Sequence, residues 1–212
     1  SPDAIEHQDS TVEVKSILKN NKEVAAIVDP TIAAEFPDIT DYRKFVSMLR
    51  ELGFRYILEG AFGVDLIARE YAKLIEDYKG KYYVFANDPV VVNYIVKFQP
   101  ELIPNLAPLV NPAVASSLVA RKKYGSQLKT VYIGPLIATK KKEERGRNEG
   151  FINSVLTFTE LRKLFQEFHI VEKELEYSEF DPPFGAEGAL FPIATGILEA
   201  AGLNQNLMNG KI

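Results

Sequence analysis

Short apolar runs alternate with segments of helical periodicity along most of the chain. Runs of β-branched, aromatic and small apolar side chains predict buried strands at residues 24–28, 54–58, 81–86, 131–133 and 151–156. Apolar side chains spaced three and four residues apart predict helices at residues 12–20, 31–36, 41–52, 62–78, 112–124, 157–168 and 193–201. This alternation indicates an α/β fold, with short and mostly parallel sheets flanked by helices.

Capping residues support several of these helix boundaries. Thr40 precedes one predicted helix and can accept a hydrogen bond from its first turn, and Gly53 follows the same helix in the usual C-terminal position. Thr157 and Glu160 have the spacing of a capping box, in which each side chain accepts a hydrogen bond from the backbone of the other residue. A helix is therefore expected to begin at Thr157.

Composition narrows the function classes. The chain has 212 residues, a net charge of −4 and a pI near 5.4, which argues against nucleic acid or an acidic membrane surface as a partner. It contains no cysteine, which excludes disulfides, thiolate catalysis and iron–sulfur ligation in its usual mode. His7 and His169 are far apart in the sequence, so a histidine-based zinc site is not expected. Any metal would need oxygen ligands.

The sequence contains no pattern that directs it to a membrane. No apolar run approaches the roughly 20 residues that a membrane helix needs. The first residues lack the basic and then apolar pattern of a signal peptide. We therefore expect a cytoplasmic location, with other proteins or neighbouring domains as partners.

The stretch Thr-Val-Tyr-Ile-Gly-Pro-Leu-Ile-Ala-Thr-Lys at residues 130–140 leads from a predicted strand to a strand end, where open α/β sheets usually bind ligands. Gly134 and Pro135 end the strand, because proline has no amide hydrogen for a sheet ladder. The stretch resembles a signature of the iron-only (FeFe) hydrogenase catalytic domain, in which Gly-Pro-Cys is followed by two small residues and a lysine. Here Leu136 takes the cysteine position and Thr139 the lysine position.

Other segments resemble the same family in the same order. Asp29-Pro30 stands where the family has Ala-Pro, and Asp88 stands where a second ligand cysteine precedes a proline. The following Pro-Val-Val-Val-Asn-Tyr-Ile at residues 89–95 is similar to the sensory, regulatory branch of the family. A carboxylate replaces thiolate poorly at an iron–sulfur cluster, because such clusters select soft sulfur donors.

Two more segments carry the resemblance. In the predicted helix at residues 62–78, Tyr71 and Leu74 occupy the positions at which catalytic members have two proton-relay carboxylates. The Gly-rich stretch at residues 181–192 is similar to the family loop that covers the cluster. The resemblance therefore implies that the proton relay is lost and that the covering loop is retained.

The resemblance also implies an architecture. Family members bind the H-cluster, a 4Fe–4S cubane bridged to a two-iron centre, in a cleft between two lobes, here expected at residues 23–128 and 129–212. The cleft would be lined by Asp29, Pro30, Pro135, Gly185, Gly188 and Phe191. Residues 1–22 would follow a ferredoxin-like region, since the first five residues resemble the end of a ferredoxin cluster motif. The last ligand motif of the family would lie beyond residue 212, and the sensory branch implies a signalling domain downstream.

Each changed position also has a structural interpretation. Asp88 is well suited to cap a helix that begins at Pro89. Leu136 can fill the space of a cluster, Thr139 can lie in a solvated loop, and Tyr71 can belong to the core. With these interpretations, no residue of this chain replaces the cluster ligands of the family. We therefore expect neither a metal nor a cofactor.

Three functional hypotheses follow from the resemblance. The chain is a cluster-free, non-catalytic hydrogenase-like domain with a role in regulation or protein interaction. Alternatively, it is a fragment of a true hydrogenase or hydrogen sensor that is truncated or has had its cysteines removed. In the third hypothesis, the vacated cleft binds a small organic ligand or supports another enzyme activity.

Overall fold

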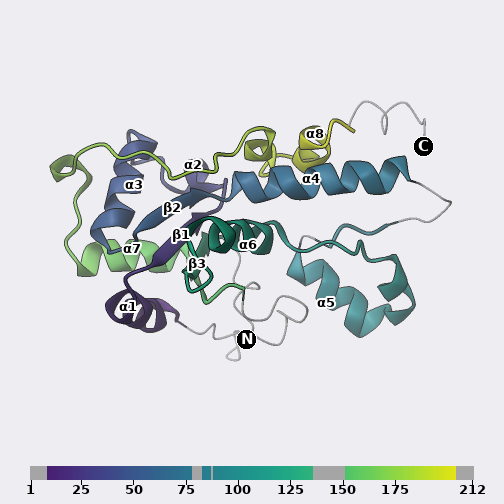
Figure 1. Cartoon of the computed structure of the whole chain (residues 1–212), viewed down its shortest axis with the longest axis horizontal. Coiled ribbons are helices and arrows are strands. Elements are labelled where there is room, and N and C mark those ends of the chain that lie inside the picture. The colour runs from purple at the N-terminus through teal and green to yellow at the C-terminus, as the bar shows by residue number, and fades with distance from the viewer. Residues whose placement is uncertain (1–8, 78–82, 87, 136–150, 204–212) are drawn as a thin grey trace, which may run out of the picture.

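The computed structural model describes residues 9–77, 83–86, 88–135 and 151–203. The α-helices are α1 (Thr11–Asn20), α2 (Ile32–Glu35), α3 (Tyr42–Glu51), α4 (Ala61–Glu76), α5 (Pro89–Phe98), α6 (Pro112–Tyr124), α7 (Phe158–Glu167) and α8 (Gly196–Ala200). The strands are β1 (Val24–Val28), β2 (Tyr56–Glu59), β3 (Lys129–Gly134) and β4 (Ser154–Thr157). Short 3-10 helices are η1 (Pro100–Asn105), η4 (Glu172–Glu174) and η5 (Glu187–Leu190) (Figure 1).

The strands form one parallel sheet in the order β2-β1-β3-β4. All five residues of β1 are buried, as are all four of β4. Strands of a parallel sheet that are covered on both faces are expected to be apolar throughout, which is why the apolar runs at β1 and β3 predict strands. The α/β prediction is confirmed. The sheet takes β1 and β2 from the predicted lobe at residues 23–128 and β3 and β4 from the one at residues 129–212.

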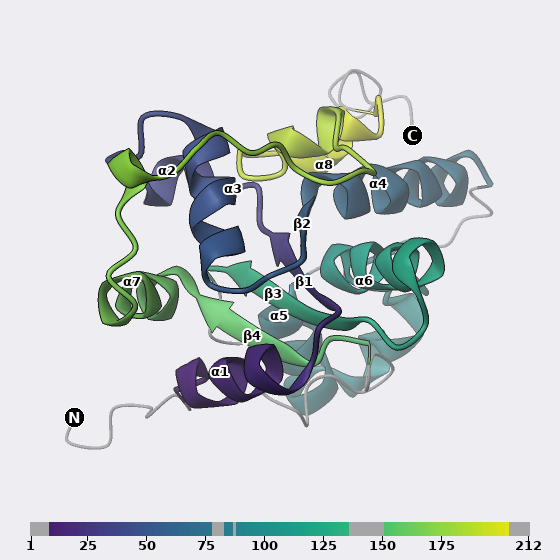
Figure 2. The same cartoon turned by 60° about the vertical axis from the view of Figure 1, so that its left-hand side comes forward.

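Helices cover both faces of the sheet (Figures 1 and 2). Val24, Ala26 and Val28 face a cluster formed with α1, α3 and α7, whose centre includes four phenylalanine rings 5.3–6.4 Å apart. Ala25 and Ile27 face the opposite side, where α6 packs. The alternation of side chains along β1 therefore divides the core into two layers.

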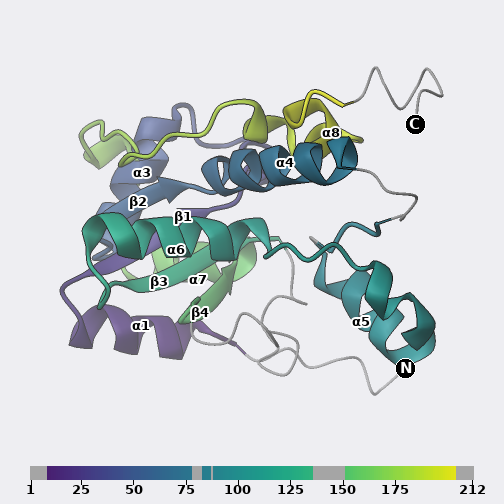
Figure 3. The same ribbon diagram turned by 45° about the vertical axis from the view of Figure 1, so that its right-hand side comes forward.

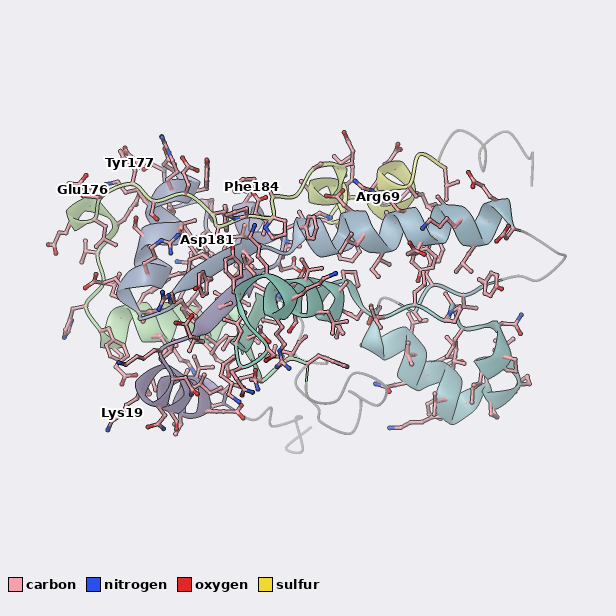
Figure 4. The ribbon with its side chains drawn as sticks, in the orientation of Figure 1. Lys19, Arg69, Glu176, Tyr177, Asp181 and Phe184 are labelled. Atoms are coloured by element: carbon pink, nitrogen blue, oxygen red, sulfur yellow. The ribbon has the colours of Figure 1, made fainter. Side chains whose placement is uncertain are left out.

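A C-terminal strap, residues 175–184, covers the outer edge of β2. The Asp181 amide donates to the Ile57 carbonyl at 2.7 Å, and the Ile57 amide donates to the Asp181 carboxylate at 2.7 Å. Arg50 of α3 donates to Asp181 as well, at 3.0 Å. Figure 4 shows Tyr177 and Asp181 on this segment, with Asp181 nearer the sheet. The strap satisfies backbone groups that an edge strand would otherwise leave open for pairing.

The capping predictions had different outcomes. The capping box is confirmed, because the Thr157 hydroxyl and the Glu160 carboxylate each accept from the other residue's amide. Thr40 is not the cap of α3. Asp41 takes that place and accepts from the Arg43 amide, while Thr40 donates to Glu172. The helix thus begins one residue later, where a carboxylate can satisfy its first turn.

The predicted strand at residues 81–86 is wrong for the residues that the structure describes. Val84 forms an isolated bridge with Leu106 and no ladder. Tyr83 and Phe85 pack against α4 in a cluster that contains Tyr71. The aromatic alternation therefore reflects an extended segment lying on a helix. Similar alternation is also the pattern of a strand, so periodicity could not separate the two.

None of the helices within the described ranges combines the length and the apolar character needed to cross a membrane. The longest of them, α4, extends away from the sheet and packs against α6 and α8 (Figure 3). Gly63 allows α4 and α6 to approach closely, because a Cβ atom there would overlap the Pro112 carbonyl and the Ser116 hydroxyl.

We predict that Gly63→Ala destabilises the protein by about 1–3 kcal/mol, the usual cost of overpacking. This cost exceeds the roughly 1 kcal/mol by which alanine is the better helix former. Urea unfolding gives the free energy of unfolding of each variant. Arg69→Ala, at an exposed position of the same helix, is the control and should change it by less than about 0.5 kcal/mol. A Gly63→Ala protein as stable as the parent would show that α4 and α6 do not pack this closely.

Candidate functional site

The strand order creates a switch point between β1 and β3. The chain passes from β1 to β2 on one side of the sheet, and β3 then pairs on the other side of β1. Ligands in open α/β sheets bind outside the carboxyl ends of the strands at such a point. Asp29 and Pro30 follow β1 there, and Pro135 follows β3. The Asp29 amide donates to the Ile133 carbonyl at 2.8 Å, so these strand ends are adjacent.

The Asp29 carboxylate is the polar centre of this edge. It is 5% exposed and accepts from the amide and the hydroxyl of Thr31, at 2.9 and 2.6 Å. Its second oxygen accepts from the Tyr132 hydroxyl of β3. Burial, together with the negative charge of Asp29, raises the pKa of Tyr132 well above its usual value. The carboxylate therefore joins β1, β3 and the segment that enters α2.

The Gly-rich loop lies against the start of α4, beside the carboxyl end of β2. The Gly185 amide donates to the Glu59 carboxylate at 2.6 Å. The amides of Ala186 and Gly188 both donate to the Asp65 carboxylate, the first at 2.7 Å. A Cβ atom at position 188 would overlap the Ala61 carbonyl, so glycine is required for this approach. Because protein carboxylates already bind these amides, the loop does not offer them to a phosphate.

The predicted cleft-lining residues differ in exposure. Asp29 and Gly188 are buried, Pro30, Gly185 and Phe191 are partly buried, and Pro135 is exposed. The structure brings Asp29, Pro30 and Pro135 together at the carboxyl ends of β1 and β3. It packs Gly185 and Gly188 against the start of α4, the helix that follows β2. Leu136 and Thr139 lie outside the described residues.

Asp88 has the geometry of a helix cap. Its carboxylate accepts from the Val90 amide at 2.8 Å, at the start of α5. Pro89 is the first residue of that helix, as the structural interpretation of Asp88 predicts. Figures 1 and 3 show α5 away from the sheet and its flanking helices α3 and α7.

Tyr71 and Leu74, which the resemblance assigns to the proton-relay positions, belong to an apolar cluster between α4, α6 and residues 83–86. Tyr71 is 1% exposed, and its hydroxyl accepts from the Ala86 amide at 3.1 Å. Burial raises the pKa of this hydroxyl. It therefore remains protonated through the physiological range, and the position serves packing.

Sequence reasoning missed three polar residues of this region. The sequence pattern predicts Tyr132 only as a strand residue, and it does not single out Glu59 or Asp65. Asp65 stands among the apolar residues of the buried face of α4, which was a usable signal, because a buried carboxylate needs hydrogen-bond partners. For Tyr132 the only signal was its place near the end of a central strand.

We predict that Asp88→Ala weakens α5 by about 1 kcal/mol, whereas Asp88→Asn changes it by only a few tenths, because asparagine caps as well as aspartate. Amide hydrogen exchange across α5 measures this local stability. Exchange should be several-fold faster in Asp88→Ala alone. Equal acceleration in both variants would show that the charge, and not the cap, is required.

We predict that Tyr132→Phe lowers the free energy of unfolding at neutral pH by about 1.5–3 kcal/mol, the usual contribution of a hydrogen bond to a charged group. The raised pKa means that the unfolded chain loses the Tyr132 proton at a lower pH than the folded protein does. The stabilising contribution is therefore complete below about pH 10 and falls above it, by up to about 1.4 kcal/mol per pH unit.

Chemical unfolding at several alkaline pH values tests this expectation. The parent protein and Tyr132→Phe should converge in stability as the pH rises above about 10, the ordinary pKa of tyrosine. Tyr94→Phe removes an exposed hydroxyl and controls for the loss of one tyrosine. A difference between the parent and Tyr132→Phe that stays constant with pH would contradict the shifted pKa.

Comparison with known proteins gives consistent matches. Residues 22–212 match the family described as iron only hydrogenase large subunit, C-terminal domain. Iron hydrogenase 1 from Clostridium pasteurianum is 30% identical over an aligned length of 176 residues, and the match covers 74% of this chain and 31% of that protein.

Solved structures show the same fold. Apo FeFe-hydrogenase HydA1 from Chlamydomonas reinhardtii has a TM-score of 0.72 at 21% identity, over 92% of this chain and 58% of that chain. Another variant of HydA1 has a TM-score of 0.68 at 23% identity, over 84% of this chain and 52% of that one. The chain thus spans about a third of the curated relative and little more than half of these structures. The family match extends over nearly all of its residues, and the chain belongs to the family formed by the C-terminal domain of the iron-only hydrogenase large subunit.

Proposed function

We propose that this chain is a cluster-free member of its family that acts in regulation through protein binding and does not catalyse hydrogen chemistry. The observation that carries the proposal is the absence of cysteine from all 212 residues. The family binds its cluster through thiolates, and no side chain other than cysteine supplies a thiolate. The sequence at residues 89–95, which is similar to the sensory branch, supports the regulatory part of the proposal.

The residues present do not fit the H-cluster. Asp88 could offer a carboxylate at a ligand position, but this group already accepts the Val90 amide. Within the described ranges, no group of three or more histidine, cysteine, aspartate or glutamate side chains could hold a metal ion. No reaction step through the cluster therefore follows from these side chains.

The surrounding positions support a scaffold role. Asp29 is fully engaged with Thr31 and Tyr132, and Tyr71 is part of an apolar cluster. In a catalytic site, donors and relay groups must face the reacting centre. Here the same positions stabilise strand ends and helix packing, so they contribute to folding.

Iron and acid-labile sulfide analysis, combined with a visible absorption spectrum, tests the proposal. Protein purified without oxygen should contain no stoichiometric iron and should show no charge-transfer absorption, because it has no thiolate ligands. The result should be the same after incubation with ferrous iron and sulfide. Stoichiometric iron with charge-transfer absorption would overturn the proposal.

Asp88→Asn provides the matched variant for this assay. Asparagine keeps the helix cap but removes the charged carboxylate. If the parent protein bound iron and Asp88→Asn did not, Asp88 would be an unorthodox ligand. The proposal predicts identical, iron-free proteins.

A further inference from the structure

Basic side chains gather at the edge of the sheet where the strands begin. Residues 19–23, 51–55 and 121–129 lead into β1, β2 and β3 at this edge, and we call these three segments the amino edge. They contain seven lysine or arginine residues and two glutamates, whereas the whole chain has more acidic than basic residues, 29 against 25. Like charges gathered on one surface attract a partner of the opposite charge. The amino edge is therefore a surface of this acidic chain that favours an acidic partner.

Backbone hydrogen bonds hold the three segments side by side. The Arg55 amide donates to the Val24 carbonyl at 2.9 Å, and the Lys129 amide donates to the Glu23 carbonyl at 3.0 Å. Figure 3 shows the ends of α1 and α6 at this edge of the sheet. One of the two glutamates, Glu23, already forms an ion pair with Arg55. The amino edge is thus one surface with a surplus of cations.

Two tyrosine rings orient cations of the amino edge. Tyr56 and Tyr124 are stacked, with ring centres 4.1 Å apart. Arg55 lies over the Tyr56 ring at 5.5 Å, and Lys123 lies over the Tyr124 ring at 5.7 Å. Both rings are partly buried, so they limit the freedom of these two side chains before any partner binds. A cation that is already oriented loses less side-chain entropy when it forms a new ion pair.

The Arg121 guanidinium is partly buried without an anion. Its Nη2 donates to the Asn153 side-chain oxygen at 3.1 Å, while its Nε is buried and has no hydrogen-bond partner. No carboxylate of a described residue forms an ion pair with it, and burial lowers the pKa of Arg121. The dipole of α6 favours a cation in its last turn, but it does not explain this burial. A cation removed from water without a counter-charge costs stability, so the fold alone gives Arg121 no purpose.

The Nη1 of Arg121 is placed to bind an anion. Arg121 is partly exposed, and Nη1 is not among the buried atoms that lack a partner, so this nitrogen reaches the surface. The two Nη groups of a guanidinium form a planar fork that matches the two oxygens of a carboxylate. Partial burial strengthens such a pair, because fewer water molecules screen it.

The charges of the chain favour a carboxylate over a phosphate polymer. A phosphate also matches the guanidinium fork. The net charge of −4 and the presence of Glu23 within the amino edge repel a polymer that is negative throughout, whereas a protein surface can present carboxylates between neutral and basic groups. The partner chemistry that fits is an acidic polypeptide.

We propose that the amino edge docks an acidic segment of a partner protein and that Arg121 binds one of its carboxylates. This inference rests on the proposed function, because it names the chemistry of the partner that a regulatory scaffold would bind. The two remain separable, since iron content tests the first and peptide binding tests the second.

Fluorescence anisotropy with a labelled octaglutamate peptide tests the docking at low and at physiological salt. We expect the full chain to bind the peptide with an affinity that falls as the salt concentration rises. Arg121→Met should weaken binding about tenfold or more, because it removes a charge-assisted hydrogen bond from a partly desolvated site. Lys97→Gln removes the same charge from an exposed position on α5, away from the amino edge, and should change the affinity less than about twofold.

The stability of Arg121→Met separates binding from folding. Methionine keeps an apolar stem at this position and removes the uncompensated charge. Urea unfolding should therefore show a free protein at least as stable as the parent, as expected for a residue retained for binding. A clear loss of stability would show that the fold itself needs the guanidinium, and it would overturn the proposal.

Three other outcomes would overturn the proposal as well. Failure of the parent protein to bind octaglutamate at low salt would show that the amino edge does not recognise acidic polypeptides. Equal weakening by Arg121→Met and Lys97→Gln would show that only the net charge acts. Tighter binding of octathymidylate than of octaglutamate would identify a phosphate polymer as the occupant.

Discussion

The ladder between β1 and β3 is the contact on which the arrangement of the candidate site depends. It pairs Val24–Val28 with residues 129–133, more than a hundred positions later, and so creates the switch point of the sheet. Both strands are largely buried, so their backbone groups need partners within the sheet. The ladder satisfies them, and the Asp29 carboxylate continues the connection by accepting from Tyr132 at the strand ends. If β1 and β3 were paired differently, Asp29 and Pro135 would not be neighbours.

Local sequence patterns predicted helices and strands correctly where the pattern fits only one kind of structure. The apolar run at Val24–Val28 is found as a strand with the predicted bounds, and the capping box at Thr157 begins a helix as expected. The segment at residues 81–86 failed because an extended chain on a helix has the same aromatic alternation as a strand. The bond between Tyr132 and Asp29 joins residues 103 positions apart, and no local pattern encodes such a pair. The strap along β2 was missed for the same reason.

The positions at which the resemblance predicts a loss of family residues are used by the fold itself. Asp88 satisfies an open amide at the start of α5, and Tyr71 fills a helix interface. The Gly-rich loop is held by the carboxylates of Glu59 and Asp65. If a buried cluster site were left empty, the polar groups around it would have no hydrogen-bond partners, at a cost of about 1–3 kcal/mol each. In this chain the described polar groups of the sheet edge have protein partners, which is consistent with folding in the absence of a cluster.

Differential scanning calorimetry before and after treatment with an iron chelator tests this account most directly. A scaffold that needs no cluster should unfold in one cooperative transition, with equal calorimetric and van't Hoff enthalpies. Its Tm should be the same in both samples, because removing a ligand changes stability only if the folded state had bound it. A Tm that falls after chelation, or a transition that disappears, would show that a bound metal stabilises the fold and would contradict the account.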